Sequence, residues 1–108
     1  MSKYHNKKIT VGDLHFDSLK EALRYGELLE RQKAGSITDL RTQVRFELIP
    51  KQKGERACFY VADFVYKDRD GERVVEDVKG SKRMLTDVYK IKKKLMLKVH
   101  GIKVKEIF

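Results

Sequence analysis

The chain reads ACFYVADFVYKDRDGERVVEDVK over residues 57–79, and this stretch gives the clearest indication of the fold class. Its first part is rich in aromatic and β-branched residues, which favour a strand over residues 57–66. The Asp70-Gly71 pair is a turn signal, because glycine reaches the backbone conformations that tight hairpin turns require. The segment RVVEDVK then predicts a returning strand over residues 73–79. We therefore expect a β-hairpin at the centre of the fold.

On the N-terminal side of this hairpin, the sequence predicts a helix followed by a strand. Ser18 and Glu21 have the spacing of a capping box, in which each side chain bonds the backbone N–H of the other residue. Apolar residues then recur at helical spacing until Gly35, a residue type that commonly follows the end of a helix, so we expect a helix over residues 18–34. Apolar and polar residues alternate over residues 44–49, which predicts a strand.

On the C-terminal side, the sequence predicts a second helix and a last strand. The helix covers residues 86–99, with lysines around most of its surface. Its apolar side chains recur on one face: Val88, Ile91, Leu95 and Val99. Gly101 ends this helix, and residues 102–108 alternate as a strand. The predicted order is α-β-β-β-α-β, an α/β (α+β) fold in which helices flank a mixed sheet.

Length and composition narrow the class of protein. The chain has 108 residues, 41% of them apolar, which fits a single domain over residues 1–108 and leaves a homodimer open as a way to bury more surface. No apolar run approaches the roughly 18 residues that a membrane span needs. Residues 1–9 form a basic arm that lacks the apolar stretch of a signal peptide, and we expect this arm to be mobile. The only cysteine, Cys58, excludes an internal disulfide, so we expect a reduced, cytoplasmic protein.

Positive charge is concentrated in the last quarter of the chain. The formal net charge is +9, and residues 79–105 hold ten Lys or Arg against one acid, whereas the remainder has 15 basic and 15 acidic residues. A clustered basic face gains free energy by releasing the counterions that condense on nucleic acid, so this asymmetry favours a polyanionic partner. The alternative is a solvated, lysine-rich helix without a partner. The candidates for phosphate contacts are Lys82, Arg83, Lys90, Lys93 and Lys94.

Two aspartates and a lysine on the predicted hairpin form the candidate site. Asp63 lies inside an apolar strand, where an ionised carboxylate costs free energy unless a cation or hydrogen bonds compensate it. On the returning strand, Asp77 and Lys79 project from one face and Glu76 from the other, because side chains alternate. Two carboxylates and an ammonium group can hold Mg²⁺ beside a phosphate, as phosphodiester cleavage requires. A cross-strand salt bridge on a solvated face is the alternative, and a bulge would bring in Glu76.

This arrangement resembles the PD-(D/E)XK nuclease superfamily. The stretches that carry the resemblance are FDSLKEALRYGELLERQKAG, QVRFELIP, YVADFVY and VVEDVKG, and they are most similar to small phage-encoded members. The resemblance implies a restriction-endonuclease-like core, in which Asp63 closes the second strand and Asp77-Val78-Lys79 is the triplet on the third. The chain departs from the motif at Ala62, where the family has the proline that names it, and at Asp77, where glutamate is commoner.

The resemblance also implies an activity and the roles of the site residues. The protein would be a metal-dependent endonuclease that hydrolyses DNA phosphodiester bonds and leaves a 5′-phosphate and a 3′-hydroxyl. One or two Mg²⁺ or Mn²⁺ ions would be held by Asp63, Asp77 and the Val78 carbonyl, with Glu21 completing the site. Lys79 would orient and polarise the attacking water.

Further roles and the biological setting are also expectations. Gln43, at the start of the first predicted strand, is a candidate to brace the site or the DNA backbone. The resemblance points to phage recombination, replication or packaging in the host cytoplasm. Branched DNA such as a Holliday junction would be a fitting substrate, and phage or host recombination proteins would be partners. The alternative function is a non-catalytic nucleic-acid-binding module that uses the basic C-terminal helix.

Overall fold

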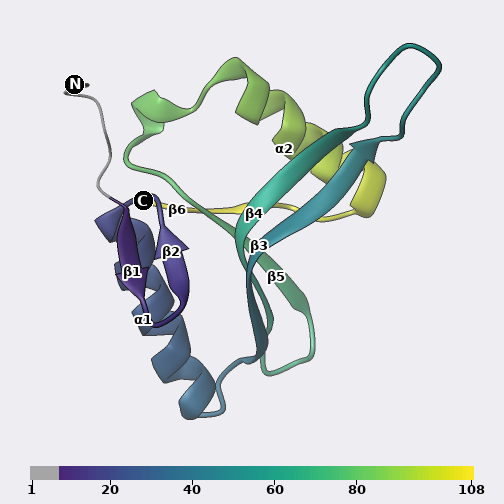
Figure 1. Ribbon diagram of the computed structural model, residues 1–108. Coiled ribbons are helices and arrows are strands. Elements are labelled where there is room, and N and C mark those ends of the chain that lie inside the picture. The colour runs from purple at the N-terminus through teal and green to yellow at the C-terminus, as the bar shows by residue number, and fades with distance from the viewer. Residues whose placement is uncertain (1–7) are drawn as a thin grey trace, which may run out of the picture.

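The hairpin predicted at residues 57–79 forms the centre of a four-stranded sheet in the computed structural model, which describes residues 8–108 apart from the Met84 side chain (Figure 1). The strands of this sheet are β3 (Thr38–Ile49), β4 (Cys58–Lys67), β5 (Arg73–Val78) and β6 (Lys105–Ile107). β4 pairs antiparallel with both β3 and β5, whereas β6 pairs parallel with β5. The sheet is therefore mixed, with the order β3-β4-β5-β6.

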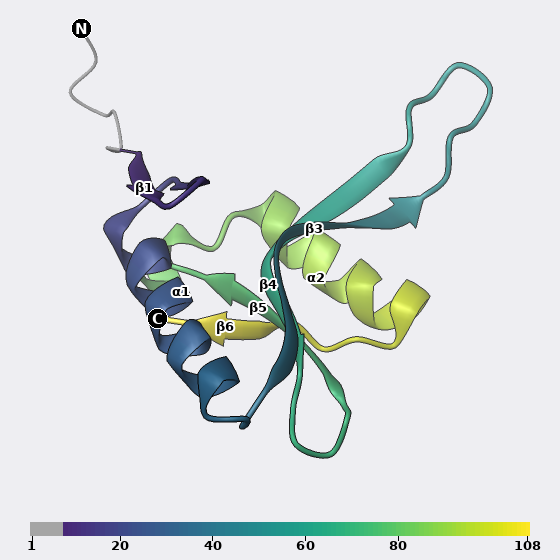
Figure 2. The ribbon, with the colours of Figure 1, turned by 60° about the horizontal axis from the view of Figure 1, so that its bottom comes forward.

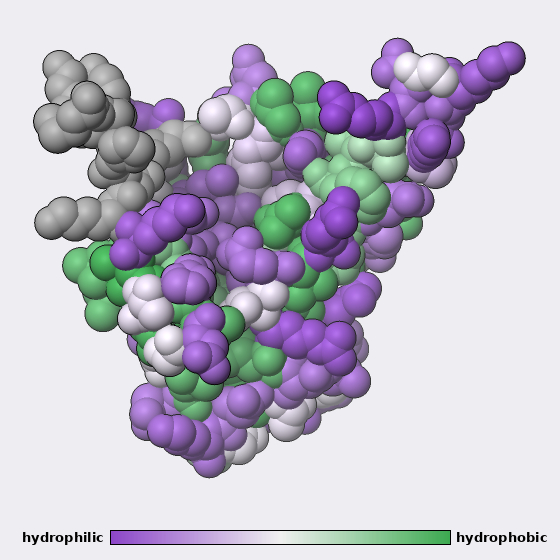
Figure 3. Space-filling model, viewed as in Figure 1, coloured by the Kyte–Doolittle hydropathy of each residue, from purple (hydrophilic) through white to green (hydrophobic). Residues whose placement is uncertain are grey.

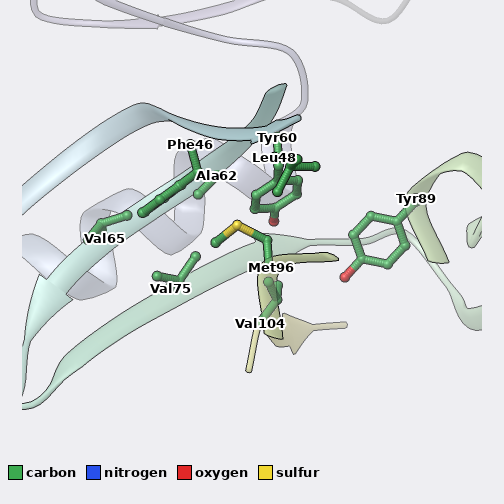
Figure 4. Close-up of a cluster of buried hydrophobic side chains, with 9 residues drawn as sticks. All are labelled: Phe46, Leu48, Tyr60, Ala62, Val65, Val75, Tyr89, Met96 and Val104. Carbon is green, nitrogen blue, oxygen red and sulfur yellow. The ribbon is translucent and has the colours of Figure 1, made fainter. Parts of the chain in front are cut away.

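The two helices pack on opposite faces of this sheet (Figure 2). α1 (Leu19–Lys33) buries Ala22 and Leu28 against Phe64 and Tyr66 of β4. α2 (Asp87–His100) covers the other face, and the apolar cluster there is drawn in Figure 4: Phe46, Leu48, Tyr60, Ala62, Val65, Val75, Tyr89, Met96 and Val104. The order α1-β3-β4-β5-α2-β6 confirms the predicted α-β-β-β-α-β arrangement in one mixed α/β domain. Among residues 8–108, neither helix has the length and apolar composition needed to cross a membrane.

Both helices begin and end at the residues that the sequence indicates. Ser18 Oγ accepts from the Glu21 N–H at 3.1 Å, and Gly35 after α1 adopts a left-handed φ of +81°. Thr86 caps α2 in the same way, and Gly101 follows with φ +67°. One half of the predicted capping box differs, because Glu21 Oε2 accepts from the backbone N–H of Asp17, at 3.2 Å, rather than from that of Ser18.

The buried face of α2 is not the one that the apolar pattern indicated. Val88, Ile91 and Val99 are 63%, 56% and 49% exposed, whereas Tyr89 and Met96 are buried. Large side chains bury more apolar surface than valines do, so the helix is rotated by about one residue toward the tyrosine and the methionine. The predicted stripe therefore faces solvent along most of its length.

The N-terminal region contains a small hairpin that the sequence reading missed. β1 (Ile9–Val11) and β2 (Leu14–Phe16) pair antiparallel around a turn in which Gly12 has φ +60°. Phe16 is only 2% exposed and packs on α1 and β4. The predicted mobile arm over residues 1–9 is therefore wrong at its C-terminal end, since β1 begins at residue 9, while residues 1–7 lie outside the described residues.

The outer part of β3 and β4 extends beyond the sheet as a two-stranded ribbon. β3 begins at residue 38, six residues before the predicted strand, and stays paired with β4 as far as Ile49↔Cys58. β5, however, pairs with β4 only from Lys67 to Phe64. Residues 44–62 thus form a two-stranded extension, which we call the β3–β4 arm; its base packs on α2 through buried side chains, and its tip projects beyond the body (Figures 1 and 2). The end of α2 supports the arm, because His100 Nε2 lies 2.7 Å from the Glu47 carbonyl oxygen.

Candidate active site

The candidate site lies at the fork where β4 separates from β5. The last paired residues of these strands are Phe64 and Glu76, so Asp63 has already left the ladder. Its carboxylate bridges the opening instead: Asp63 Oδ2 accepts from the backbone N–H of Val78 at 2.7 Å. A buried N–H without a partner is costly, so this bond both satisfies the end of β5 and fixes the position of Asp63.

Asp77 and Lys79 point to the same side of the fork, as strand alternation predicted. Lys79 Nζ lies 3.1 Å from Asp77 Oδ1, and the Tyr60 hydroxyl donates to Asp77 Oδ2 at 2.6 Å. The ammonium group also lies 3.8 Å from the centre of the Tyr89 ring, within the range of a cation–π interaction. Two independent contacts therefore hold the lysine head group, although its stem is long and flexible.

The first turn of α1 forms the opposite wall of the site. It brings Glu21 to a cleft of about 420 Å³. The residues that line this cleft are Asp17, Ser18, Lys20, Glu21, Val61, Asp63, Asp77, Val78, Lys79 and Gly80. Sequence reasoning missed Lys20, although its position at the start of a helix whose N-terminus faces the site was a usable signal. A helix N-terminus and two lysines make this acidic cleft suitable for a phosphate group.

Burial and a neighbouring carboxyl group raise the pKa of each aspartate. For Asp63, burial and the neighbouring Glu21 carboxyl raise the pKa to about 7, against the opposing bonds from the Val78 N–H and Gln43. For Asp77, burial raises the pKa, and the charge of Asp63 adds to this effect, although Tyr60 and Lys79 oppose it. Carboxylates whose ionised forms are destabilised by burial and by a neighbouring carboxyl favour a nearby cation.

The donor set fits a hard divalent cation. Within residues 8–108, no three His, Cys, Asp or Glu side chains gather closely enough to enclose a metal on their own. Mg²⁺ does not require such a cage, because it usually takes one or two carboxylates and keeps several waters. Asp63 and Asp77, which both line the cleft, would supply those carboxylates, the Val78 carbonyl would be a further oxygen donor, and the cleft of about 420 Å³ would leave room for water and phosphate.

Glu76 lies on the other face of β5 and takes no part in this cleft. It is fully buried, and Arg24 of α1 binds both of its oxygens, with Nε at 2.8 Å and Nη2 at 2.6 Å, while the Tyr66 hydroxyl donates to it as well. Burial alone would raise the pKa of Glu76, but these bonds outweigh it and the pKa is lowered. The register of β4 and β5 has no bulge here, so Glu76 is not brought into the site.

Gln43 stands opposite Asp63 on β3. Its Nε2 lies 3.5 Å from Asp63 Oδ1, and its backbone has a left-handed φ of +51°. Non-glycine residues adopt this conformation at a cost of about 1–2 kcal/mol. The strain falls at the point where the ribbon bends away from the sheet, and there Gln43 contacts the carboxylate of Asp63.

The family described as "Protein of unknown function (DUF1064)" matches residues 1–107. The chain belongs to the DUF1064 family. No curated protein and no solved structure matches it. The function of this DUF1064 protein must therefore be argued from the site itself.

The predicted basic residues of the DUF1064 chain are distributed over two other places. Lys82 and Arg83 are exposed in η1 (Lys82–Met84), directly after the strand that carries Asp77. A separate groove of about 240 Å³ on α2 is lined by Lys90, Lys93, Lys94, Leu97 and Lys103. Lys93 Nζ lies 3.2 Å from Glu106 Oε2, so one of these charges is already paired. The structure thus brings Glu21, Asp63, Asp77 and Lys79 together, but not the helix lysines.

Proposed function

We propose that this protein is a metal-dependent deoxyribonuclease that hydrolyses phosphodiester bonds. One observation carries the proposal: Asp63, Asp77 and Lys79 line a single open cleft, although they come from two strands that no longer pair there. A salt bridge on a solvated face would need only one of the aspartates. A cation accounts for the second aspartate, because Asp63 has a raised pKa itself and also raises the pKa of Asp77.

The residues have distinct tasks in this reaction. Asp63, Asp77 and the Val78 carbonyl would hold Mg²⁺ or Mn²⁺, with Glu21 beside them. When bound, the ion would stabilise charge on the phosphate and lower the pKa of a bound water. Lys79, held by Asp77 and the Tyr89 ring, would orient the attacking water and stabilise negative charge on the scissile phosphate. Lys20 and the first turn of α1 would bind the phosphate from the opposite wall.

The resemblance to the PD-(D/E)XK nucleases supports this proposal. The order α1-β3-β4-β5-α2-β6 agrees with the core that the resemblance implies. The departure at Ala62 is also compatible with the fold. Ala62 is paired with Val44 inside the β3–β4 ladder and is fully buried, a place where a proline would remove a backbone N–H. By this resemblance the products would carry a 5′-phosphate and a 3′-hydroxyl, and branched DNA in phage recombination, replication or packaging would be a fitting substrate.

Cleavage assays test the proposal. Purified protein would be incubated with supercoiled plasmid and with a synthetic four-way junction, in Mg²⁺, Mn²⁺ or EDTA. We expect cutting that requires the metal, is lost in Lys79→Ala and is kept in Lys33→Ala, which removes an exposed lysine from the last turn of α1. Preference for the junction would indicate a resolvase. Tight binding without cutting in any metal would contradict the proposal and favour a non-catalytic nucleic-acid-binding module.

A further inference from the structure

The β3–β4 arm begins at the mouth of the cleft. Val61 of the arm lines the cleft, two residues from Asp63 on the same strand. From there outward, each strand of the arm pairs only with the other, because β5 has ended its pairing at Phe64. The tip is closed by a tight turn in which Gln52 and Glu55 exchange both backbone hydrogen bonds, and Gly54 has φ +82°. The arm is thus a defined ribbon rather than a loose loop.

The exposed charges of the arm are mainly positive. Its tip over residues 51–56 reads KQKGER, with three cations, Lys51, Lys53 and Arg56, and one acid. Figure 3 shows the arm projecting from the body, with hydrophilic residues at its tip. No ion pair joins these three cations to an acid among the residues that the structure describes. Their charges are therefore free to meet a polyanion.

A fourth cation is held close to the cleft. The Arg45 guanidinium lies 4.1 Å from the centre of the Phe59 ring, which fixes its position on the surface of the arm. Arg45 is also the pairing partner of Val61, so it lies two residue pairs outward from the level of Gln43 and Asp63. At roughly 7 Å for two residues of strand, this step is about the distance between successive phosphates on one strand of DNA.

We propose that the β3–β4 arm binds the phosphates of duplex DNA beside the bond that is cut. Residue 55, at the tip, is eight residues from Asp63 along the chain. In an extended strand, at roughly 3.3 Å per residue, this separation corresponds to about 26 Å. That length spans about eight base pairs at ~3.4 Å per pair. A paired ribbon of this length, packed on α2 at its base, matches a duplex, whereas a single strand has no fixed axis for it to follow. The inference rests on the proposed function, because it takes the cleft as the place of cutting.

Binding measurements on the full chain test the role of the arm. The tip variant Lys51→Gln/Lys53→Gln/Arg56→Gln would be compared with the control Lys33→Gln/Lys67→Gln/Arg69→Gln. The control removes the same charge from exposed residues at the end of α1 and at the β4–β5 turn, far from the arm. Both would be made in a Lys79→Ala background, so that affinity for a 24-base-pair duplex (about 80 Å at ~3.4 Å per pair) can be measured in Mg²⁺ from 50 to 300 mM salt.

The arm variant should bind the duplex about tenfold or more weakly at 100 mM salt, with a salt slope shallower by about two to three, since each lost phosphate contact lowers the slope by about 0.9. The control should bind like its parent. An equal loss in both variants, an unchanged tip variant, or no duplex binding by any of them would overturn the proposal. So would an equal loss on a single strand of the same length. If the wild type does not cut plasmid, the proposed nuclease activity is contradicted, but the binding result still decides whether the arm binds DNA.

Discussion

Replacing Asp63 by asparagine is expected to stabilise the metal-free protein while it abolishes metal-dependent cutting. Burial and the neighbouring Glu21 carboxyl raise the pKa of Asp63 to about 7, so at pH 8 the fold contains an ionised carboxylate in unfavourable surroundings. Asparagine keeps an oxygen that can accept from the Val78 N–H, but it carries no charge. The substitution therefore removes the repulsion and leaves the bridge across the fork intact.

The magnitude follows from the difference between the folded and unfolded pKa values of Asp63. An unperturbed aspartate titrates near ~3.9, so the folded value is higher by about three units, or roughly 4 kcal/mol. Asp63 is only partly buried and faces the open cleft, so solvent screening reduces this to about 2 kcal/mol. For a domain of this size, the corresponding gain in Tm is on the order of 10 °C.

The pH dependence of this gain distinguishes electrostatics from packing. Because the folded pKa of Asp63 is raised, the wild type keeps its full stability below about pH 4 and loses stability as the pH rises to about 7, whereas Asp63→Asn does not. Thermal unfolding in EDTA should show the full advantage of Asp63→Asn at pH 8 and about a third of it at pH 5. Asp77→Asn is the control, and it should gain less because it also gives up the ion pair with Lys79. Equal stability of Asp63→Asn and the wild type at pH 8, or the same advantage at both pH values, would refute the reasoning.

Three further predictions concern the framework around the site, each measured by urea unfolding. Arg24→Met should lower the free energy of unfolding by about 3–5 kcal/mol, since it leaves the fully buried Glu76 carboxylate without its ion pair; a loss under about 1 kcal/mol would contradict the buried pairing. Gln43→Gly should raise the free energy of unfolding by about 0.5–1 kcal/mol, because glycine adopts φ +51° without strain. The same variant should cut DNA more slowly. A lower free energy of unfolding would argue against strain at this position. Met96→Ala should cost about 2–5 kcal/mol and the matched control Ile91→Ala under about 1 kcal/mol, whereas the reverse order would mean that α2 packs by its other face.

Local sequence signals predicted the elements of the fold and their order. The cap of α1 by Ser18 and the end of α2 at Gly101 each depend only on residues within a few positions, so the sequence alone predicts them. The same holds for the side of β5 on which Asp77 and Lys79 lie, because alternation is a property of one strand. These signals therefore predicted that two of the three central site residues, Asp77 and Lys79, lie on one face of the strand.

Features that depend on contacts between distant segments could not be predicted in this way. The orientation of α2 depends on how well Tyr89 and Met96 fill the space against the sheet, and the periodic pattern of its valines and isoleucine gives no information on that fit. Glu76 forms a buried ion pair with Arg24, which is 52 residues away in sequence, so the sequence around Glu76 does not indicate this pairing. The β3–β4 arm was equally hidden, since nothing within residues 44–62 shows that β5 stops pairing at Phe64.

The buried bond between Arg24 and Glu76 has a consequence for the width of the cleft. Arg24 lies one helical turn after Glu21, and Glu76 immediately precedes Asp77. The bond therefore joins, behind the cleft, two elements, α1 and β5, whose acidic side chains line it. A charged pair buried in the core acts as a spacer that sets how far the helix stands from the strand. Substitutions that shorten or lengthen this spacer would alter the gap available to an ion and a phosphate without changing any group that touches them.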